Sequence, residues 1–282
     1  MKGLRSLLAH GTRSTACGVV LCALAGLIGQ HPAQAATGGL LTDGNSSVGL
    51  SLNSSAGLTN WLVNGINQVR QQWFWFRIGG GGPEADISTI SAPVTSSANA
   101  HQLTVTYDLP GQYGVTVKYD LSGGLNPSLT EAVTIANHTT GILDFHFFEY
   151  GHVTLGNSTA NQSVLFTSDL TGITSVGQYG TGGQSYQSAF TLSGSRAEAG
   201  LTTDVPNTLA KLTDANPTTL NNNQSSGPGD ATYGVEWDLS INAGASKQIS
   251  ILTSVPEPSV VGLGALGLIS LVGMRRKSQI KA

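Results

Sequence analysis

The segment Gln71-Gln72-Trp73-Phe74-Trp75-Phe76-Arg77-Ile78 decides the fold class, because its large side chains alternate without a helical spacing. In an extended strand, successive side chains point to opposite faces, so Trp73, Trp75 and Arg77 share one face and the two phenylalanines share the other. Aromatic residues on both faces are typical of a strand that is buried on both sides. A glycine-rich run then ends the strand.

Between its two ends, the chain repeats this pattern of short apolar runs separated by turn residues. Asn64-Gly65 between apolar residues predicts a tight hairpin, because both positions tolerate positive φ. The run 130–136 is expected to turn through 137–141 into a strand over 142–150. A proline in the first turn and leucines three apart predict one short helix over 206–215. With 37 glycines and only 10% charged residues, the sequence predicts an all-β fold, an antiparallel β-sandwich of about ten to twelve strands.

Charge and cysteine usage narrow the class of function. Residues 36–254 hold six basic and 15 acidic side chains, a net charge of −9, whereas binding to a phosphate backbone requires a basic face. We therefore expect no nucleic-acid partner. Both cysteines, Cys17 and Cys22, lie in the N-terminal apolar run. The rest of the chain can form no disulfide and depends on its core.

The first 35 residues have the three zones of a secretory signal peptide. Basic residues come first, an apolar run over 16–28 follows, and a polar segment ends in Ala33-Gln34-Ala35. The small residues Ala33 and Ala35 predict cleavage by signal peptidase after Ala35. A membrane-spanning helix is the weaker alternative, because the 13 apolar residues rise only about 20 Å against a hydrocarbon core of about 30 Å.

The last 28 residues contain a second membrane signal in a different order. Val255-Pro256-Glu257-Pro258-Ser259 is followed by a mostly apolar segment over 260–274 and then by Arg275-Arg276-Lys277. The basic cluster predicts that the C-terminus stays in the cytoplasm. The apolar segment is short and rich in glycine, which is typical of a weak and temporary transmembrane anchor.

This C-terminal pattern resembles the PEP-CTERM protein-sorting signal of Gram-negative bacteria. Proteins with that signal are substrates of exosortase, a membrane cysteine protease. The resemblance implies processing at or near Pro256-Glu257-Pro258 on the way to the cell surface or the exopolysaccharide matrix. The segments 71–77, 212–215 and 235–239 also resemble stretches of exported β-proteins with the same tail. The expected domains are a signal peptide (1–35), an exported β-sandwich (36–254) and a sorting signal (255–282).

One strand face carries residues that suit a sugar. Trp73 and Trp75 could stack on pyranose rings, and Arg77 could form hydrogen bonds to hydroxyl groups, so these three residues are the candidate glycan-binding site. Burial of the same face in the core is the stronger alternative, because the strand is apolar on both faces.

Three pairs of ionisable residues are candidates for acid–base chemistry or metal binding. They are Asp144 with His146, Glu131 with Glu149, and Glu236 with Asp238. The first pair points the same way from one strand, but the sequence identifies no third or fourth ligand, and a solvated strand face is the simpler interpretation. Either of the other pairs could supply the two carboxylates of a glycosidase, if strand pairing brings them to a suitable distance. We predict no catalytic residue, no metal site and no cofactor.

These patterns together predict an exported protein of the cell surface or the exopolysaccharide matrix with a non-catalytic, structural or adhesive role. It would cross the inner membrane, be anchored transiently by its C-terminal helix and then be released or attached to the surface. Signal peptidase and exosortase are the expected processing enzymes, and extracellular polysaccharide is a candidate partner. The alternative is a secreted carbohydrate-binding module or carbohydrate-active enzyme.

Overall fold

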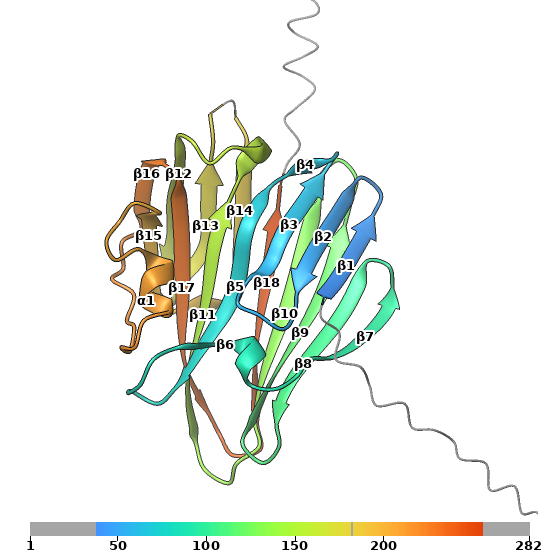
Figure 1. Cartoon of the computed structure of the whole chain (residues 1–282). Helices are drawn as coiled ribbons and strands as arrows, with labels where there is room; N and C mark the ends of the chain where they lie inside the picture. Colours follow the sequence, from blue (N-terminus) through green and yellow to red (C-terminus); the bar gives the residue numbers. More distant parts are fainter. Residues whose placement is uncertain (1–37, 182, 256–282) are drawn as a thin grey trace, which may run out of the picture. The chain divides into compact units, whose positions relative to one another are not determined.

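The structure, a computed structural model, describes residues 38–181 and 183–255. Within this part of the chain, two nine-stranded sheets form a β-sandwich, which confirms the predicted all-β class (Figure 1). The strands outnumber the ten to twelve expected, because short segments at the sheet edges also pair as strands.

Several predicted features lie outside the described residues. They are the signal peptide with Ala33 and Ala35, the apolar segment 260–274, and the sorting residues Pro256, Glu257, Pro258, Ser259, Arg275, Arg276 and Lys277. Val255 is described and buried, and its backbone N–H donates to the carbonyl of Pro127 at 3.1 Å. No helix in residues 38–181 and 183–255 is long and apolar enough to cross a membrane.

Sheet A contains the strand that decides the fold class, and all of its pairs are antiparallel except β3 with β5. In spatial order it consists of β1 (Gly38–Asp43), β2 (Ser46–Ser51), β3 (Gly57–Val63), β5 (Val69–Ile78), β11 (Leu143–Val153), β17 (Ala231–Ile241) and β15 (Arg196–Leu201), with β4 (Ile66–Asn67) beside β3 and β6 (Ala85–Asp86) beside β5.

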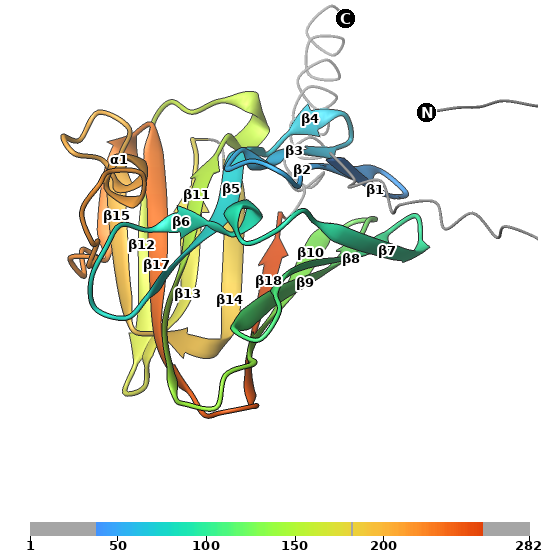
Figure 2. The same ribbon diagram turned by 60° about the horizontal axis from the view of Figure 1, so that its bottom comes forward.

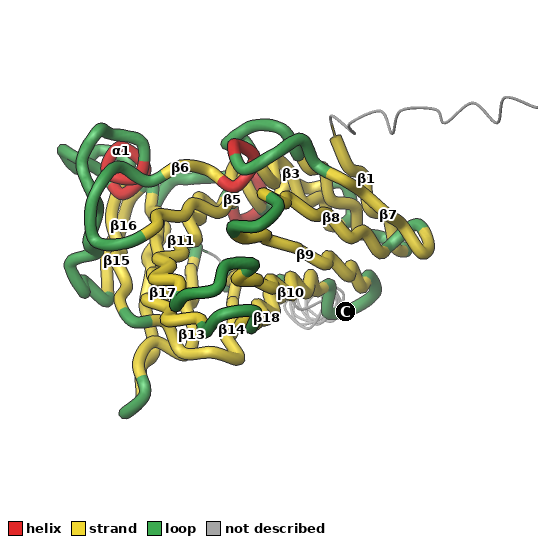
Figure 3. Tube along the Cα trace, turned by 90° about the horizontal axis from the view of Figure 1, so that it is seen from below, coloured by secondary structure: helices red, strands yellow, loops and turns green. Residues whose placement is uncertain are grey.

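Sheet B is antiparallel throughout and forms the second layer, which is seen from below in Figure 3. In spatial order it consists of β16 (Ser225–Gly229), β12 (Gln162–Asp169), β13 (Gly172–Tyr179), β14 (Ser185–Gly194), β18 (Ser246–Ser254), β10 (Ser128–Asn137), β9 (Tyr113–Ser122), β8 (Gln102–Leu109) and β7 (Val94–Asn99). The connections contain one short helix, α1 (Thr208–Leu212), inside the range predicted for it, and the 3₁₀ turns η1 (Ile87–Thr89) and η2 (Leu155–Asn157).

The predicted turns have different outcomes. Asn64 and Gly65 join β3 to β4 with φ of 52° and 78°, which confirms the hairpin. The hairpin expected over 130–150 is wrong, because β10 belongs to sheet B and β11 to sheet A, so the chain crosses between the layers. Asn137 holds this crossing in place. Its buried amide donates to the carbonyls of Gly141 at 2.7 Å and Ile241 at 2.9 Å.

Aromatic side chains of β5 and β11 fill the space between the sheets. Phe74 stacks on Phe147 at a ring distance of 5.3 Å, and Phe76 stacks on Phe145 at 5.6 Å. From sheet B, Tyr113 packs against Phe76 at 5.6 Å. Such contacts add about 0.5–1.5 kcal/mol each to the burial of apolar area, so this layer is the centre of the core.

The other face of β5 is also covered. The segment with β6 and η1 crosses it, as Figure 2 shows, and the chain after α1 contacts it through Thr218. Arg77 links the two covers. Its Nε is 2.9 Å from Oε1 of Glu84, and its Nη2 donates to the carbonyl of Thr218 at 3.3 Å. Sheet A is therefore buried on both faces around β5.

A pair of carboxyl groups lies inside the sandwich. Glu131 on β10 and Glu149 on β11 are 1% and 0% exposed, and Nε2 of Gln72 donates to both, at 2.6 and 3.0 Å. Burial, together with the nearby charge of Glu149, raises the pKa of Glu131 to about 8 against the hydrogen bond from Gln72. Burial raises the pKa of Glu149 to about 7, against hydrogen bonds from Gln72 and Tyr233. One hypothesised glycosidase pair thus comes together, but the core encloses it and no sugar reaches it.

These carboxyl groups should make the domain less stable as the pH rises. Both folded-state pKa values lie above the ordinary value of 4.5, so between about pH 4.5 and 8 the folded chain binds more protons than the unfolded chain. Each group then lowers the free energy of unfolding by up to about 1.4 kcal/mol per pH unit. Urea unfolding followed by tryptophan fluorescence should show this decline, and Glu131→Gln should flatten it. A stability that rises over this range in both proteins would contradict the assignment.

Candidate functional site

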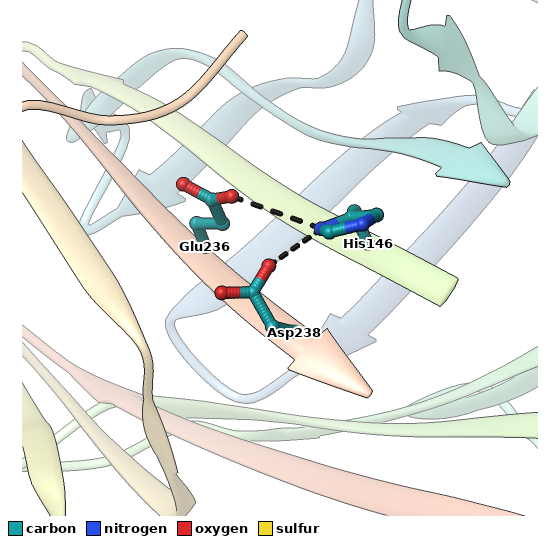
Figure 4. Close-up of side chains that lie close together, drawn as sticks. All are labelled: His146, Glu236 and Asp238. Carbon is teal, nitrogen blue, oxygen red and sulfur yellow. Dashed lines mark hydrogen bonds and ion pairs between the residues drawn. The ribbon is translucent and has the colours of Figure 1, made fainter. Parts of the chain in front are cut away.

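A cluster of ionisable side chains lies on the outer face of sheet A, where β11 and β17 pair. The register places His146 opposite Asp238. Because alternate residues of a strand share a face, Asp144 on β11 and Glu236 on β17 point the same way. Strand pairing thus brings the pair Asp144 and His146 and the pair Glu236 and Asp238 together in one cluster. Figure 4 shows His146, Glu236 and Asp238.

The imidazole of His146 is the centre of the cluster. Its Nδ1 is 2.5 Å from Oδ1 of Asp238 and 3.9 Å from Oε1 of Glu236. Its Nε2 is 3.7 Å from Oδ1 of Asp144. A histidine with a carboxylate on one ring nitrogen is held in a fixed orientation, which leaves the other nitrogen to exchange a proton.

Glu236 is the buried member of the cluster. Its pKa is raised to about 7, chiefly by burial and also by the neighbouring Asp238 charge, whereas the backbone N–H of Leu220 and the Arg196 guanidinium oppose the rise. The Leu220 N–H donates to Oε2 at 2.9 Å, and Arg196 Nε lies 4.0 Å from the same oxygen. Glu236 therefore gains and loses a proton near neutral pH, as a general acid or base must.

Exposure increases from the sheet outward. The Glu236 side chain is 2% exposed and that of His146 is 16%, whereas Asp238 and Asp144 reach 37% and 62%. A solute can therefore reach His146 and the two aspartates but not Glu236.

The same atoms could hold a cation. One ligand atom each from His146, Glu236 and Asp238 lies within 4.8 Å of the others. Imidazole and carboxylate together suit zinc or manganese.

The tryptophan face predicted as a glycan platform is not available. Trp73 and Trp75 are each 1% exposed and Arg77 is 5% exposed. The indole of Trp75 packs edge-on against Tyr150 at 6.1 Å. This burial leaves no ring face for a sugar, as the core alternative expects.

Sequence reasoning missed the residues that support the cluster from other segments. Arg196 opposes Glu236 across the β15–β17 pair, the loop after α1 brings in the Leu220 N–H, and Ser195 Oγ accepts from the Asp238 N–H at 2.8 Å. None of them has a spacing that relates it to His146. The sequence signals for the cluster were the alternation of Asp144 with His146 and that of Glu236 with Asp238.

Comparison with known families identifies the C-terminal tail. A family model, the PEP-CTERM protein-sorting motif, matches residues 254–277. The chain therefore carries the sorting motif of exported, exosortase-processed proteins, which confirms the resemblance read from Pro256, Glu257 and Pro258. No curated protein sequence matches the chain.

Solved structures resemble the β-sandwich in fold. A bacterial glucoamylase complexed with acarbose has a TM-score of 0.54 and 12% identity, over 82% of this chain and 34% of the glucoamylase. A protein from Synechocystis sp. PCC 6803 has a TM-score of 0.53 and 10% identity, over 78% of this chain and 95% of that one. A galactose mutarotase-like protein from Lactobacillus casei has a TM-score of 0.47 and 11% identity, over 77% and 99% of the two chains.

The likeness to the glucoamylase corrects one prediction. The sequence favoured a protein that is not an enzyme, whereas the described domain has a fold that a carbohydrate-active enzyme uses. At 12% identity the likeness is one of fold, and this chain spans about a third of the glucoamylase, 34%.

The proton affinity of Glu236 provides a test of the cluster. Asp238→Asn removes a negative charge that raises the pKa of Glu236, so that pKa should fall below about 7. Arg196→Ala should raise it. Carbon-13 NMR titration of the glutamate carboxyl groups measures both changes, with Asp144→Asn as the control at the outer edge of the cluster. A Glu236 pKa that rises in Asp238→Asn would refute the described electrostatics.

Proposed function

We propose that this chain is an exported, exosortase-processed protein whose β-sandwich acts on carbohydrate by proton transfer at His146. The observation that carries the proposal is the cluster of His146, Asp238 and Glu236, in which an imidazole is oriented by one carboxylate and lies beside a carboxyl group with a pKa of about 7. The fold shared with a glucoamylase supports carbohydrate as the class of substrate.

Distance and burial favour proton exchange at a sugar hydroxyl over hydrolysis of a glycoside. Two carboxyl groups that flank a glycosidic bond stand about 5–9.5 Å apart with the sugar between them. In the cluster the ligand atoms lie within 4.8 Å of one another, and the Glu236 side chain is 2% exposed. No sugar ring fits between Glu236 and Asp238.

His146, Asp238 and Asp144 then have defined roles. His146 Nε2, the ring nitrogen not bonded to Asp238, is the group that takes a proton from a sugar hydroxyl or returns it. Asp238 is a positioning residue, because it holds Nδ1 at 2.5 Å and stabilises the imidazolium that forms. Asp144, 3.7 Å from Nε2, lies where it can accept a hydrogen bond from a second hydroxyl. At the anomeric carbon of an aldose, loss of the hydroxyl proton and protonation of the ring oxygen open the ring, and the reverse steps close it.

Polarimetry of α-D-glucose and α-D-galactose with the purified full chain tests this activity. The chain should accelerate anomerisation, and His146→Ala should lower the rate constant by about 10²–10⁴-fold, the range for loss of a general acid–base group. Asp238→Asn should lower it less and change its pH profile. Asp214→Asn, an exposed aspartate outside the cluster, is the control. An unaccelerated reaction with both sugars, or full activity in His146→Ala, would reject the proposal.

We also propose a route by which the chain is cleaved at both ends during export. Signal peptidase would cleave after Ala35, the segment 260–274 would hold the chain in the inner membrane, and exosortase would cut near Pro256-Glu257-Pro258 to deliver residues 36–254 to the surface or matrix. The motif match over 254–277 supports this route.

Intact mass spectrometry of the protein from envelope and medium fractions tests the route. In a host with exosortase, the chain should start at Ala36 and end near Pro258, whereas deletion of exosortase should leave the C-terminus at Ala282. Glu257→Ala is a variant that should block cutting, and Glu257→Asp is its matched control. A chain that ends at Ala282 in both hosts would show that the motif is not used.

A further inference from the structure

A shallow groove crosses four neighbouring strands on the outer face of sheet B, opposite to the sheet that carries His146. It encloses about 320 Å³, and strands β12, β13, β14 and β18 form its floor. Register places Thr167, Ser175, Ala189 and Leu252 in one row on the same face, since Thr167 pairs with Ser175, Ser175 with Ala189 and Ala189 with Leu252. Small residues along its middle make the hollow. Its rim includes Thr167, Tyr179, Gln187, Leu252 and Ser254.

Tyr179 gives this groove an aromatic surface. Its side chain is 42% exposed, and no other tryptophan, tyrosine or phenylalanine among the described residues is exposed. A Cβ atom added at Gly177 would lie 2.4 Å from its Oη and 2.8 Å from its Cε2, so the ring lies across the backbone at Gly177. The ring thus lies against the strand and stays partly open to water, so that a flat apolar surface of a ligand can stack on its open side.

The polar side chains in the groove are all neutral. Gln187 offers an amide, and Thr167, Ser175 and Ser254 offer hydroxyl groups, whereas no charged side chain lines it. A site with one apolar platform and several convergent neutral donors and acceptors suits a ligand with many hydroxyl groups and no charge. The net charge of −9 over residues 36–254 also repels an anionic polymer.

We infer that this groove binds a neutral glycan, with Tyr179 stacked on a sugar ring and Gln187 bonded to its hydroxyl groups. The site lies on the other sheet from His146, so it is a second site that requires no chemistry at the first. It would hold the domain on a polysaccharide independently of any reaction at the His146 cluster.

Isothermal titration calorimetry of the full chain with maltohexaose, cellohexaose and laminarihexaose tests the inference, with an oligouronate as the charged comparison. At least one neutral oligosaccharide should bind, and the oligouronate should bind more weakly. Tyr179→Ala should weaken binding about tenfold through loss of the stacked ring, whereas Tyr179→Phe should retain it. Gln187→Ala is a second exposed variant that should also weaken binding.

Two controls separate this site from other effects. Leu170→Ala changes a fully exposed side chain between β12 and β13, outside the groove, and should bind as the unaltered chain does. His146→Ala should also retain binding, so that loss of catalysis and loss of glycan binding are distinguished. The inference is overturned if none of the three neutral oligosaccharides binds, or if Tyr179→Ala and Gln187→Ala bind as tightly as the unaltered chain.

Discussion

Pairing of β11 with β5 on one side and β17 on the other is the interaction on which the rest of the structure depends. One face of this three-strand unit presents Phe74, Phe145 and Phe147 to the interior, where sheet B packs against them. Its other face presents His146, Glu236 and Asp238. Because side chains alternate with a period of two, a slip of one residue between β11 and β17 would destroy both the core contacts and the cluster.

Two groups of carboxyl side chains in this protein have raised pKa values for the same main reason, yet their surroundings differ. Glu131 and Glu149 are enclosed between the sheets. Glu131 accepts a hydrogen bond from Gln72, and Glu149 accepts hydrogen bonds from Gln72 and Tyr233. Glu236 is buried too, but it lies beside His146, whose ring reaches solvent. Burial by itself therefore does not mark a functional carboxyl. Contact with a histidine whose ring reaches solvent distinguishes the cluster from the interior pair.

The sequence predicts the fold class of this chain because strand and turn formation depend on residues that are neighbours in the sequence. Alternation over 71–78 requires an extended strand, and Asn64-Gly65 requires positive φ, whichever strands lie beside them. Sheet membership is not local. The strands over 130–150 look like a hairpin in the sequence, but the aromatic residues of β11 on both faces place it in the middle of sheet A, away from β10. The cluster depends on the same long-range pairing, since 92 positions separate His146 from Asp238.

The last strand of the described chain is a central strand of sheet B and not an edge strand. β18 lies between β10 and β14 and ends at Ser254, where the sorting motif begins. Nine residues of β18 pair with β10 and four with β14. A pull on the tail along this strand would load those hydrogen bonds together in shear, so they would have to break at once and not one after another. This attachment would let the domain carry mechanical load from the tail into the body of sheet B.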